Sequence, residues 1–315
     1  MGRLNSNTLA IRTFALTKRF DSLTAVDSLD LEIKKGELFS LLGPNGAGKT
    51  TTINMLCCLL KPTSGTASIM GYDISKEAFK IKALIGVAPQ DTTISERLNS
   101  WENLSLIGRI HGIDSKELKK RSEELLDTVG LLERARDRVS KFSGGMKRRL
   151  SLIMALVHRP EILFLDEPTL GLDPQSRRAI WDYIVELKGK MTILLTTHYL
   201  EEADALSDRV GIMDEGKIVA LGTPDELKNS IANVNTIIVS ADNLSAKAVE
   251  GLATKDRCAE VDSDRGNLRI SGKDLDLRDI MECLYSQGIV VRSAALEQPT
   301  LEDVFLRITG KELRE

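Results

Sequence analysis

The feature that most constrains the fold of this chain is a glycine-rich segment that directly follows a short apolar run. Residues 38–42 read LFSLL, which fits a buried strand, and residues 43–50 read GPNGAGKT, which matches the pattern G-x-x-x-x-G-K-[ST]. Apolar residues at helical spacing follow from Ile53 to Leu60. A strand, a glycine loop and a helix in this order predict a phosphate-binding loop, and with it an α/β domain.

The chemistry of this loop explains its composition. Glycine lets backbone N–H groups turn toward phosphate oxygens, and the N-terminus of the following helix adds its positive dipole end. Lys49 can reach the β- and γ-phosphates of a nucleotide, and the Thr50 hydroxyl can ligate Mg²⁺. We therefore expect the phosphate-binding residues to be Gly43, Pro44, Asn45, Gly46, Ala47, Gly48, Lys49, Thr50 and Thr51.

A second apolar run, residues 162–165, ends in two carboxylates, Asp166 and Glu167. In a parallel α/β sheet, ligands bind beyond the carboxyl ends of the strands, so both acids should reach the crevice of the phosphate loop. Asp166 is then a candidate for the Mg²⁺ shell. Glu167 is a candidate for the residue that orients and polarises a water for in-line attack on the γ-phosphate.

Two further apolar runs end in polar residues that can act in the same crevice. Residues 192–195 lead to Thr196, Thr197 and His198, and His198 can hydrogen-bond the γ-phosphate and hold the attacking water in line. Gln90 follows the run that ends at residues 87–89, and its amide oxygen can contact Mg²⁺ or water. We expect the catalytic residues to be Glu167, His198, Gln90 and Lys49, and the metal ligands to be Thr50, Gln90 and Asp166.

Residues 141–151, KFSGGMKRRLS, read as a helix that begins at a serine and two glycines and continues with three cations. A helix N-terminus is already electropositive and favours acidic neighbours, so this composition indicates an anion in front of the helix. Of the cations at 147–149, we expect some to lie on the solvated face or to pair with acids.

The order of these segments resembles the ATP-binding cassette (ABC) ATPases, the motor subunits of ABC transporters, over residues ~10 to ~225. Residues 43–51 resemble the family's Walker A loop, Gln90 its Q-loop and Asp166–Glu167 its Walker B pair. Residues 142–146, FSGGM, resemble its LSGGQ signature, with Phe for Leu and Met for Gln. Residues 171–173 and His198 are similar to its D-loop and switch histidine, and Phe20 to the aromatic residue that stacks on adenine.

The resemblance implies an ABC cassette with a mixed core sheet, an antiparallel β subdomain and a helical insertion. It implies ATP and Mg²⁺ as ligands and two copies that close face to face around two ATP molecules. In that dimer the signature helix faces the γ-phosphate bound by the other copy, so that the nucleotide is also contacted in trans. The residues expected to make these contacts are Ser143, Gly144, Gly145 and Asp173. It further implies a separate integral membrane permease as partner and a peripheral location on the cytoplasmic face of the cell membrane.

The composition argues against a nucleic-acid partner, a membrane span and a zinc site. The net charge of −3 gives no overall basic field, and 4% aromatic residues are too few for stacking platforms, so we expect no nucleic-acid partner. No apolar run reaches the ~20 residues of a membrane span. The four cysteines lack zinc-ligand spacing and are expected to be free thiols.

The chain divides into residues 1–228, the nucleotide-binding domain, and residues 232–315, a small α+β accessory domain. The first begins with antiparallel strands at 8–14 and 26–33 and carries the helical insertion at about 95–140, where Leu98 and Trp101 are candidates either for contact with the permease or for the core. In the second we expect a strand at 234–240, a helix at 244–252, two strands across 258–271, a helix at 275–287 and a strand at 289–295. This order matches the ferredoxin-like arrangement. A last helix, 301–309, lies in a segment that resembles the end of drug-efflux cassettes of the daunorubicin-resistance kind.

The function predicted from these features is that of an ATP-hydrolysing motor that dimerises around two ATP molecules and drives a permease, with export favoured by resemblance. The alternative is a non-transport ABC ATPase that acts on nucleic acid or ribosomes. A nucleotide kinase, a switch GTPase and a binding module without hydrolysis fit less well, because the signature and residues 166, 167 and 198 are all present.

Overall fold

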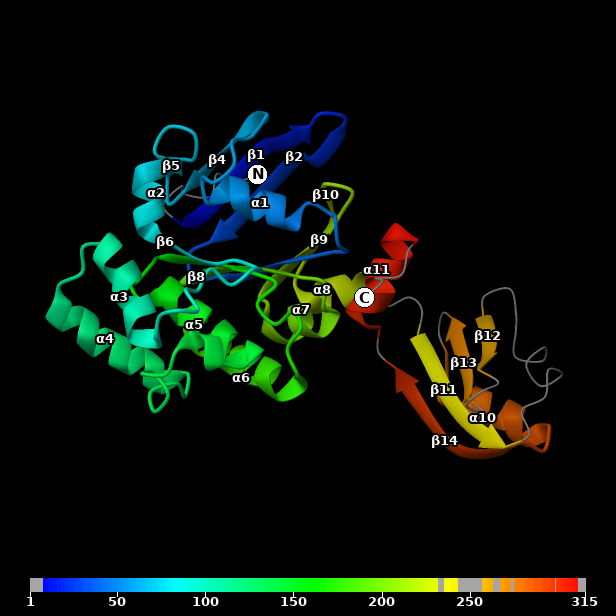
Figure 1. Cartoon of the computed structure of the whole chain (residues 1–315). Helices are drawn as coiled ribbons and strands as arrows, with labels where there is room; N and C mark the ends of the chain where they lie inside the picture. Colours follow the sequence, from blue (N-terminus) through cyan, green and yellow to red (C-terminus); the bar gives the residue numbers. More distant parts are fainter. Residues whose placement is uncertain are drawn as a thin grey trace. The chain divides into compact units, whose positions relative to one another are not determined.

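The computed structural model describes residues 8–231, 235–242, 257–262, 267–272, 275–297 and 299–310 (Figure 1). The chain forms two compact units, of which the first ends at Thr223 and the second begins at Pro224. The boundary expected from the sequence lay after residue 228, so helix α8 (Pro224–Ser230), which was expected in the first domain, falls in the second unit.

An antiparallel sheet opens the first unit, with the strand order β2-β1-β4-β5. Its strands are β1 (Leu9–Phe20), β2 (Leu23–Lys34), β4 (Ser64–Ile69) and β5 (Tyr72–Asp73). Strand β1 runs six residues beyond the predicted end at residue 14. The pairing register shifts between Thr13 and Leu16, around Ala15 with its φ of 45°, and such a bulge interrupts the alternation of apolar residues by which a strand is recognised.

The core sheet has six strands in the order β10-β9-β3-β8-β7-β6. Four of the five pairings are parallel, and β10 (Lys217–Gly222) is antiparallel to β9 (Arg209–Asp214), which gives the predicted mixed α/β sheet. Strands β3 (Leu38–Leu42), β7 (Ile162–Asp166) and β8 (Thr192–Thr197) are buried throughout, and β6 (Ile85–Ala88) is mostly buried. Their apolar runs are continuous because helices cover both faces of such a sheet.

Helices of the first unit fall into two groups. The first group lies next to strands of the core sheet in the sequence. Helices α1 (Lys49–Leu56), α6 (Pro174–Leu187) and α7 (Leu200–Leu206) each follow a core strand, and α2 (Ala78–Leu84) precedes β6. The predicted insertion contains α3 (Ser100–Ile110) and α4 (Ser115–Thr128), and α5 (Gly144–Leu156) follows it (Figure 1). Trp101 is half-buried and packs against the core that α3, α4 and α5 share, whereas Leu106 and Ile110 of α3 are exposed.

The second unit contains a four-stranded sheet in the order β12-β13-β11-β14. The strands are β11 (Asn235–Asp242), β12 (Arg257–Asp262), β13 (Asn267–Gly272) and β14 (Val290–Glu297), and all pairings are antiparallel. This is the strand order of a ferredoxin-like sheet. Helices α10 (Leu277–Ser286) and α11 (Leu301–Thr309) lie close to the predicted ranges, and the predicted helix at 244–252 lies outside the described residues.

Candidate functional site

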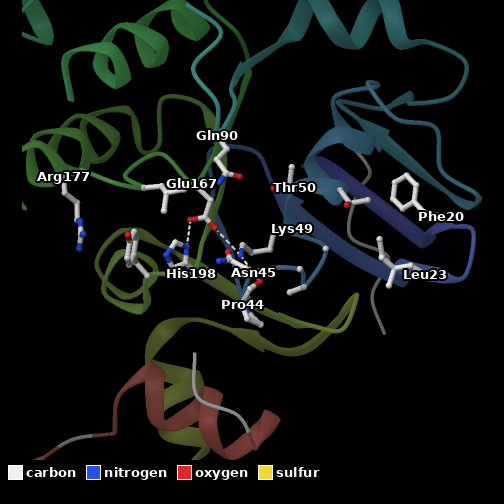
Figure 2. A pocket seen from close by; sticks show the side chains of 17 residues that line it. Phe20, Leu23, Pro44, Asn45, Lys49, Thr50, Gln90, Glu167, Arg177 and His198 are labelled. Carbon is white, nitrogen blue, oxygen red and sulfur yellow. Dashed lines mark hydrogen bonds and ion pairs between the residues drawn. The ribbon is translucent and has the colours of Figure 1, made fainter. Parts of the chain in front are cut away.

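A pocket of about 860 Å³ opens at the carboxyl ends of the core strands in the first unit, within the range typical of ligand sites. Figure 2 shows Phe20 and Leu23 at one end of the pocket, Arg177 at the other, and Lys49, Glu167 and His198 between them. The lining residues are Phe20, Leu23, Ala25, Pro44, Asn45, Gly46, Ala47, Gly48, Lys49, Thr50, Thr51, Gln90, Glu167, Leu170, Arg177, His198 and Tyr199. Except for Gly43, the residues predicted from the glycine loop all line it.

At two positions of the loop only glycine fits, because the backbone of another strand lies too close to leave room for a Cβ. Gly48 has a φ of +104°, and a Cβ added there would lie 2.2 Å from the carbonyl oxygen of Ala25 on β2. A Cβ on Gly43 would lie 2.1 Å from the carbonyl oxygen of Met213 on β9. The loop therefore lies directly against the backbone of one strand from each sheet of the first unit, and it leads into the N-terminus of α1.

Lys49 is the cation of the glycine loop in this pocket. Its Nζ donates hydrogen bonds to the carbonyl oxygens of Gly43 (2.7 Å) and Pro44 (3.2 Å), and it lies 3.2 Å from Oε1 of Glu167. Because Lys49 and Glu167 are both buried, water screens their attraction weakly. The structure thus brings the phosphate-loop lysine and the predicted water-orienting carboxylate into direct contact.

Asp166 and Thr50 face each other across the next part of the site. The hydroxyl Oγ1 of Thr50 lies 3.2 Å from Oδ1 of Asp166, and the same Oδ1 accepts a 2.5 Å hydrogen bond from Oγ1 of Thr196. The hydroxyl and carboxylate oxygens are the hard ligands that Mg²⁺ prefers. Gln90, the third predicted ligand, is exposed and lines the same pocket.

Glu167 sits in an unusual backbone conformation for a residue with a side chain. Its φ is 50°, and its backbone N–H donates to both the carbonyl oxygen and Oγ1 of Thr196, each at 3.1 Å. Its Oε2 lies 2.8 Å from Nδ1 of His198, so the predicted base and the predicted switch histidine share a hydrogen bond. Strained conformations of this kind persist where the surroundings over-determine them, which is common at functional sites.

Four predicted nucleotide contacts do not line this pocket: Ser143, Gly144, Gly145 and Asp173. Ser143 is exposed and caps α5, where its Oγ accepts a hydrogen bond from the N–H of Met146 at 3.3 Å. Asp173 caps α6 and accepts from the N–H of Ser176 at 3.0 Å. The N-terminal turns of α5 and α6 lie close to each other, since a Cβ on Gly145 would be 2.6 Å from Oγ of Ser176.

Of the three cations that follow the signature, Arg148 does not behave as a solvated charge. Lys147 forms an ion pair with Glu96, and Arg149 donates to the carbonyl oxygen of Val129 at 2.6 Å. Arg148 is 6% exposed, and its hydrogen bonds within the described part of the chain all go to backbone carbonyls. It donates to backbone carbonyls of residues 89–90 and 166–168. Sequence spacing carries no signal for this, because the acceptors are distant segments.

Three further residues of the site were given no role in the sequence analysis: Thr196, Arg177 and Tyr199. Arg177 lies with its guanidinium 4.5 Å over the ring of Tyr199, whose ring centroid is 4.1 Å from that of His198. Thr196 follows directly after a predicted strand run, and its place at the strand end beside residue 166 was the available signal. Arg177, in the first turn of α6, had no comparable signal.

A further buried carboxylate, Glu202, does not line the pocket. Its Oε1 accepts hydrogen bonds from Oγ1 of Thr169 (2.8 Å) and Nε1 of Trp181 (2.9 Å). Burial raises the pKa of this carboxyl, the hydrogen bonds lower it, and the nearby charge of Glu167 raises it further. Glu202 therefore links the segment after β7 to α6 and α7 rather than facing a ligand.

No group of three or more His, Cys, Asp or Glu side chains in the described ranges is arranged to hold a metal ion. None of the helices in the described part of the chain has the length and apolar character of a bilayer span. The described side chains of Cys57, Cys58 and Cys283 are free thiols, as predicted.

Comparison with known proteins places both units in families. Residues 26–170 match the family model described as ABC transporter, and residues 222–309 match that of the C-terminal domain of DrrA1-3-like ATP-binding proteins. The chain is 40% identical over 310 residues to the daunorubicin resistance ATP-binding protein DrrA3 of Streptomyces coeruleorubidus, with 97% of each chain covered. It is 37% identical over 305 residues to the linearmycin resistance ATP-binding protein LnrL of Bacillus subtilis, covering 95% of this chain and 98% of that one.

Solved structures agree. An ATP-binding subunit of an ABC transporter superposes with a TM-score of 0.65 at 30% identity, over 70% of this chain and 92% of that one. A dimeric post-hydrolysis cassette bound to ADP and Pi gives a TM-score of 0.63 at 28% identity, over 68% of this chain and 98% of that one. The phosphate loop, the strand-end carboxylates and these similarities agree, and the chain belongs to the ABC transporter family as an ATP-binding subunit with ATPase activity.

Proposed function

We propose that this protein is the motor of an ABC exporter: two copies close around two ATP molecules, and hydrolysis reopens them to drive a separate membrane permease. The observation that supports this most directly is the split between two sets of site residues. Lys49, Thr50 and Glu167 line the pocket, whereas Ser143 stands exposed at the tip of α5 outside it. A second copy can therefore present its Ser143 tip to a phosphate bound here.

The tip has the chemistry to bind an anion. A free helix N-terminus offers unpaired N–H groups and a positive dipole end, and Gly144 has no atom within 4 Å of where a Cβ would lie. Met146 has no strong hydrogen-bonding group, so recognition in trans relies on the Ser143 hydroxyl and the backbone. One of the similar structures is a dimer bound to ADP and Pi, which supports a dimeric cassette as the unit that acts on the nucleotide.

The metal in this proposal is Mg²⁺ on the ATP phosphates. Thr50 Oγ1 and Asp166 Oδ1 lie 3.2 Å apart, and Gln90 lines the same pocket, so the oxygen donors fit a small hard cation. When bound, Mg²⁺ would neutralise phosphate charge. Thr196 holds the Asp166 carboxylate in its orientation through the 2.5 Å hydrogen bond.

Hydrolysis in the proposal falls to Glu167 and His198. Both oxygens of Glu167 are engaged, Oε1 with Lys49 and Oε2 with His198. When phosphates draw the ammonium of Lys49 toward them, Oε1 becomes available to accept a hydrogen bond from the attacking water. His198 then holds the carboxylate in line. As the water oxygen bonds to the γ-phosphorus, the water proton passes to Glu167 and the bond between the γ-phosphorus and the β-phosphate oxygen breaks, which gives ADP and phosphate.

Export is supported by the relatives. Similar proteins are named for daunorubicin resistance, for linearmycin resistance and, in a protein of Cupriavidus metallidurans with 38% identity, for Nod factor export. The exposed apolar residues Leu106 and Ile110 on α3 lie in the insertion, where we place the contact with the permease, together with Leu98. This would set the protein on the cytoplasmic face of the membrane.

The test is the oligomeric state in ATP. Glu167→Gln, which keeps the shape of the side chain but removes the base, should elute as a dimer with ATP and Mg²⁺ and as a monomer without nucleotide. Adding Ser143→Arg to Glu167→Gln should return the protein to monomer while ATP still binds. A dimer that survives Ser143→Arg, or a Glu167→Gln protein that stays monomeric in ATP, would contradict the proposal.

The permease is tested by co-expression with a hydrophobic membrane protein encoded beside this chain. The proposal expects the ATPase to pellet with the membranes and its turnover to respond to the permease. Pelleting with ribosomes, or purification with nucleic acid, would instead support the non-transport alternative.

A further inference from the structure

The side chain of Arg148 joins α5 to the ends of two strands of the core sheet through five hydrogen bonds. Its Nη1 donates to the carbonyl oxygens of Pro89 (2.6 Å) and Gln90 (3.0 Å), which follow β6. Its Nη2 and Nε donate to the carbonyl oxygens of Asp166 (2.7 Å), Glu167 (2.6 Å) and Pro168 (2.7 Å), at the end of β7.

The match between donors and acceptors is complete. A guanidinium has five N–H donors in a fixed planar fork, and here five carbonyl oxygens accept them. The group is 6% exposed, so water does not compete for these bonds. Burial lowers the pKa of Arg148, and the charges of Asp166, Glu202 and Glu167 oppose that shift.

These five carbonyls belong to the backbone that carries the proposed catalytic side chains. Gln90 lies in one held segment and Glu167 in the other, and Glu167 is the residue with a φ of 50°. A residue in this conformation needs its surroundings to keep it there. Arg148 supplies that restraint from α5, five residues after Ser143. The same helix therefore carries both the exposed Ser143 at its N-terminus and the arginine that holds the two strand ends.

We propose that Arg148 is a positioning residue for ATP hydrolysis, which holds the backbone of Gln90 and Glu167 in the geometry that hydrolysis requires. It acts through these residues and does not touch the nucleotide. The inference rests on the roles proposed above for Glu167 and Gln90. Lysine cannot replace it, because an ammonium has three donors at one point, whereas the five acceptors surround a planar fork.

The chain offers a matched control in Arg121 of α4. Its Nε and Nη2 donate to the carbonyl oxygens of Val157 (2.8 Å) and Leu156 (2.9 Å), at the other end of α5. Arg121 therefore also donates from its guanidinium to backbone carbonyl oxygens, but at the end of α5 opposite to Ser143, and it does not line the pocket. A purely structural arginine should behave like Arg121, and a positioning arginine should not.

The experiment measures kcat, KM and the Kd of a fluorescent ATP analogue for Arg148→Lys, Arg121→Lys and the natural protein, with thermal melting of each. We expect Arg148→Lys to lower kcat by about 10- to 100-fold while Kd and KM change less than about twofold. Arg121→Lys should lower the melting temperature without this loss of kcat. Arg148→Gln, which buries no unpaired charge, serves as the second variant if Arg148→Lys does not fold.

A kcat within about twofold of the natural protein in a folded Arg148 variant would overturn the proposal, as would equal losses of kcat and nucleotide affinity. Glu167→Gln distinguishes the two levels of inference. If Glu167→Gln retains turnover while Arg148→Lys loses it, the role proposed for Glu167 is wrong and the positioning role of Arg148 stands through Gln90.

Discussion

Nζ of Lys49 lies 3.2 Å from Oε1 of Glu167, and both side chains are 5% exposed. The cation proposed to bind phosphate and the carboxylate proposed to act on the attacking water are therefore partners of each other. Breaking such a buried pair by removing one charge leaves the other uncompensated, unless a ligand replaces it. In the proposed mechanism bound phosphates replace Glu167 as the partner of Lys49, and this exchange links nucleotide binding to the release of Glu167.

Glu167→Gln should lower ATP turnover by about 100-fold or more, because it removes the proposed base. The Kd for ATP should stay within about threefold or become tighter, since Lys49 no longer pairs with a charge. Steady-state hydrolysis and nucleotide titration measure the two effects. Glu161→Gln is the control, because Glu161 is exposed and precedes the same strand β7 at its other end. Unchanged turnover in Glu167→Gln would show that another group activates the water.

Gly48→Ala and Gly46→Ala separate steric fit from backbone strain in the phosphate loop. Both glycines have a positive φ, +104° and +83°, but only at Gly48 would the Cβ collide, 2.2 Å from the carbonyl oxygen of Ala25. We expect Gly48→Ala to cost about 2–5 kcal/mol of unfolding free energy and Gly46→Ala about 1–2 kcal/mol. Urea denaturation measures both. Equal costs would mean that the loop moves away from β2 easily.

Phe20→Ala should weaken ATP binding by about 1–3 kcal/mol, the usual value of a base stacked on an aromatic ring, and Phe20→Tyr should bind like the natural protein. Phe20 is 43% exposed at the rim of the pocket, with Nζ of Lys18 4.9 Å from its ring. Phe14, also on β1 but outside the pocket and 69% exposed, gives the control Phe14→Ala. Equal Kd values for the two alanine variants would place adenine elsewhere.

The stability of the first unit should fall as the pH drops below about 6.5, because of two stacked histidines. The rings of His111 and His158 lie 3.8 Å apart, and Nε2 of His158 donates to the carbonyl oxygen of Ile85 at 2.9 Å. Burial lowers the pKa of both imidazoles below the usual 6.5, and for His158 the neighbouring His111 adds to this.

The sign follows from proton binding. Below pH ~6.5 the unfolded chain takes up protons that the native histidines refuse, so the unfolding free energy decreases as the pH falls toward the lowered pKa. Above pH ~6.5, where the histidines of the unfolded chain are also neutral, the full stability is present. Urea midpoints between about pH 7 and about pH 5 should show a smaller slope for His158→Gln than for the natural protein. Equal slopes would assign the acid sensitivity to other groups.

The local parts of the site could be predicted from the sequence, because the chemistry lies in contiguous residues. Residues 43–51 join a strand to a helix and form its first turn. Asp166 ends a buried strand, and Glu167, His198 and Gln90 come within two residues of the end of a strand of the core sheet. Parallel strands bring their carboxyl ends to one edge of the sheet, so residue type and position were enough to gather these side chains. The strand order in the sheet of the second unit could also be predicted, because the expected succession of strands and helices matches the ferredoxin-like arrangement.

Other features were decided by the tertiary structure, because their partners lie far away in the chain. The acceptors of Arg148 are 18 to 59 residues distant, and no pattern around KRR indicates that its middle residue is buried. The bulge in β1 is set by pairing with a neighbouring strand, and the φ of Glu167 by its contacts with Thr196 and Arg148. The sequence by itself determined which groups meet at the phosphate site, since local order controls strand ends. Only the folded chain decided how those groups are held, since burial and hydrogen bonding depend on distant segments coming together.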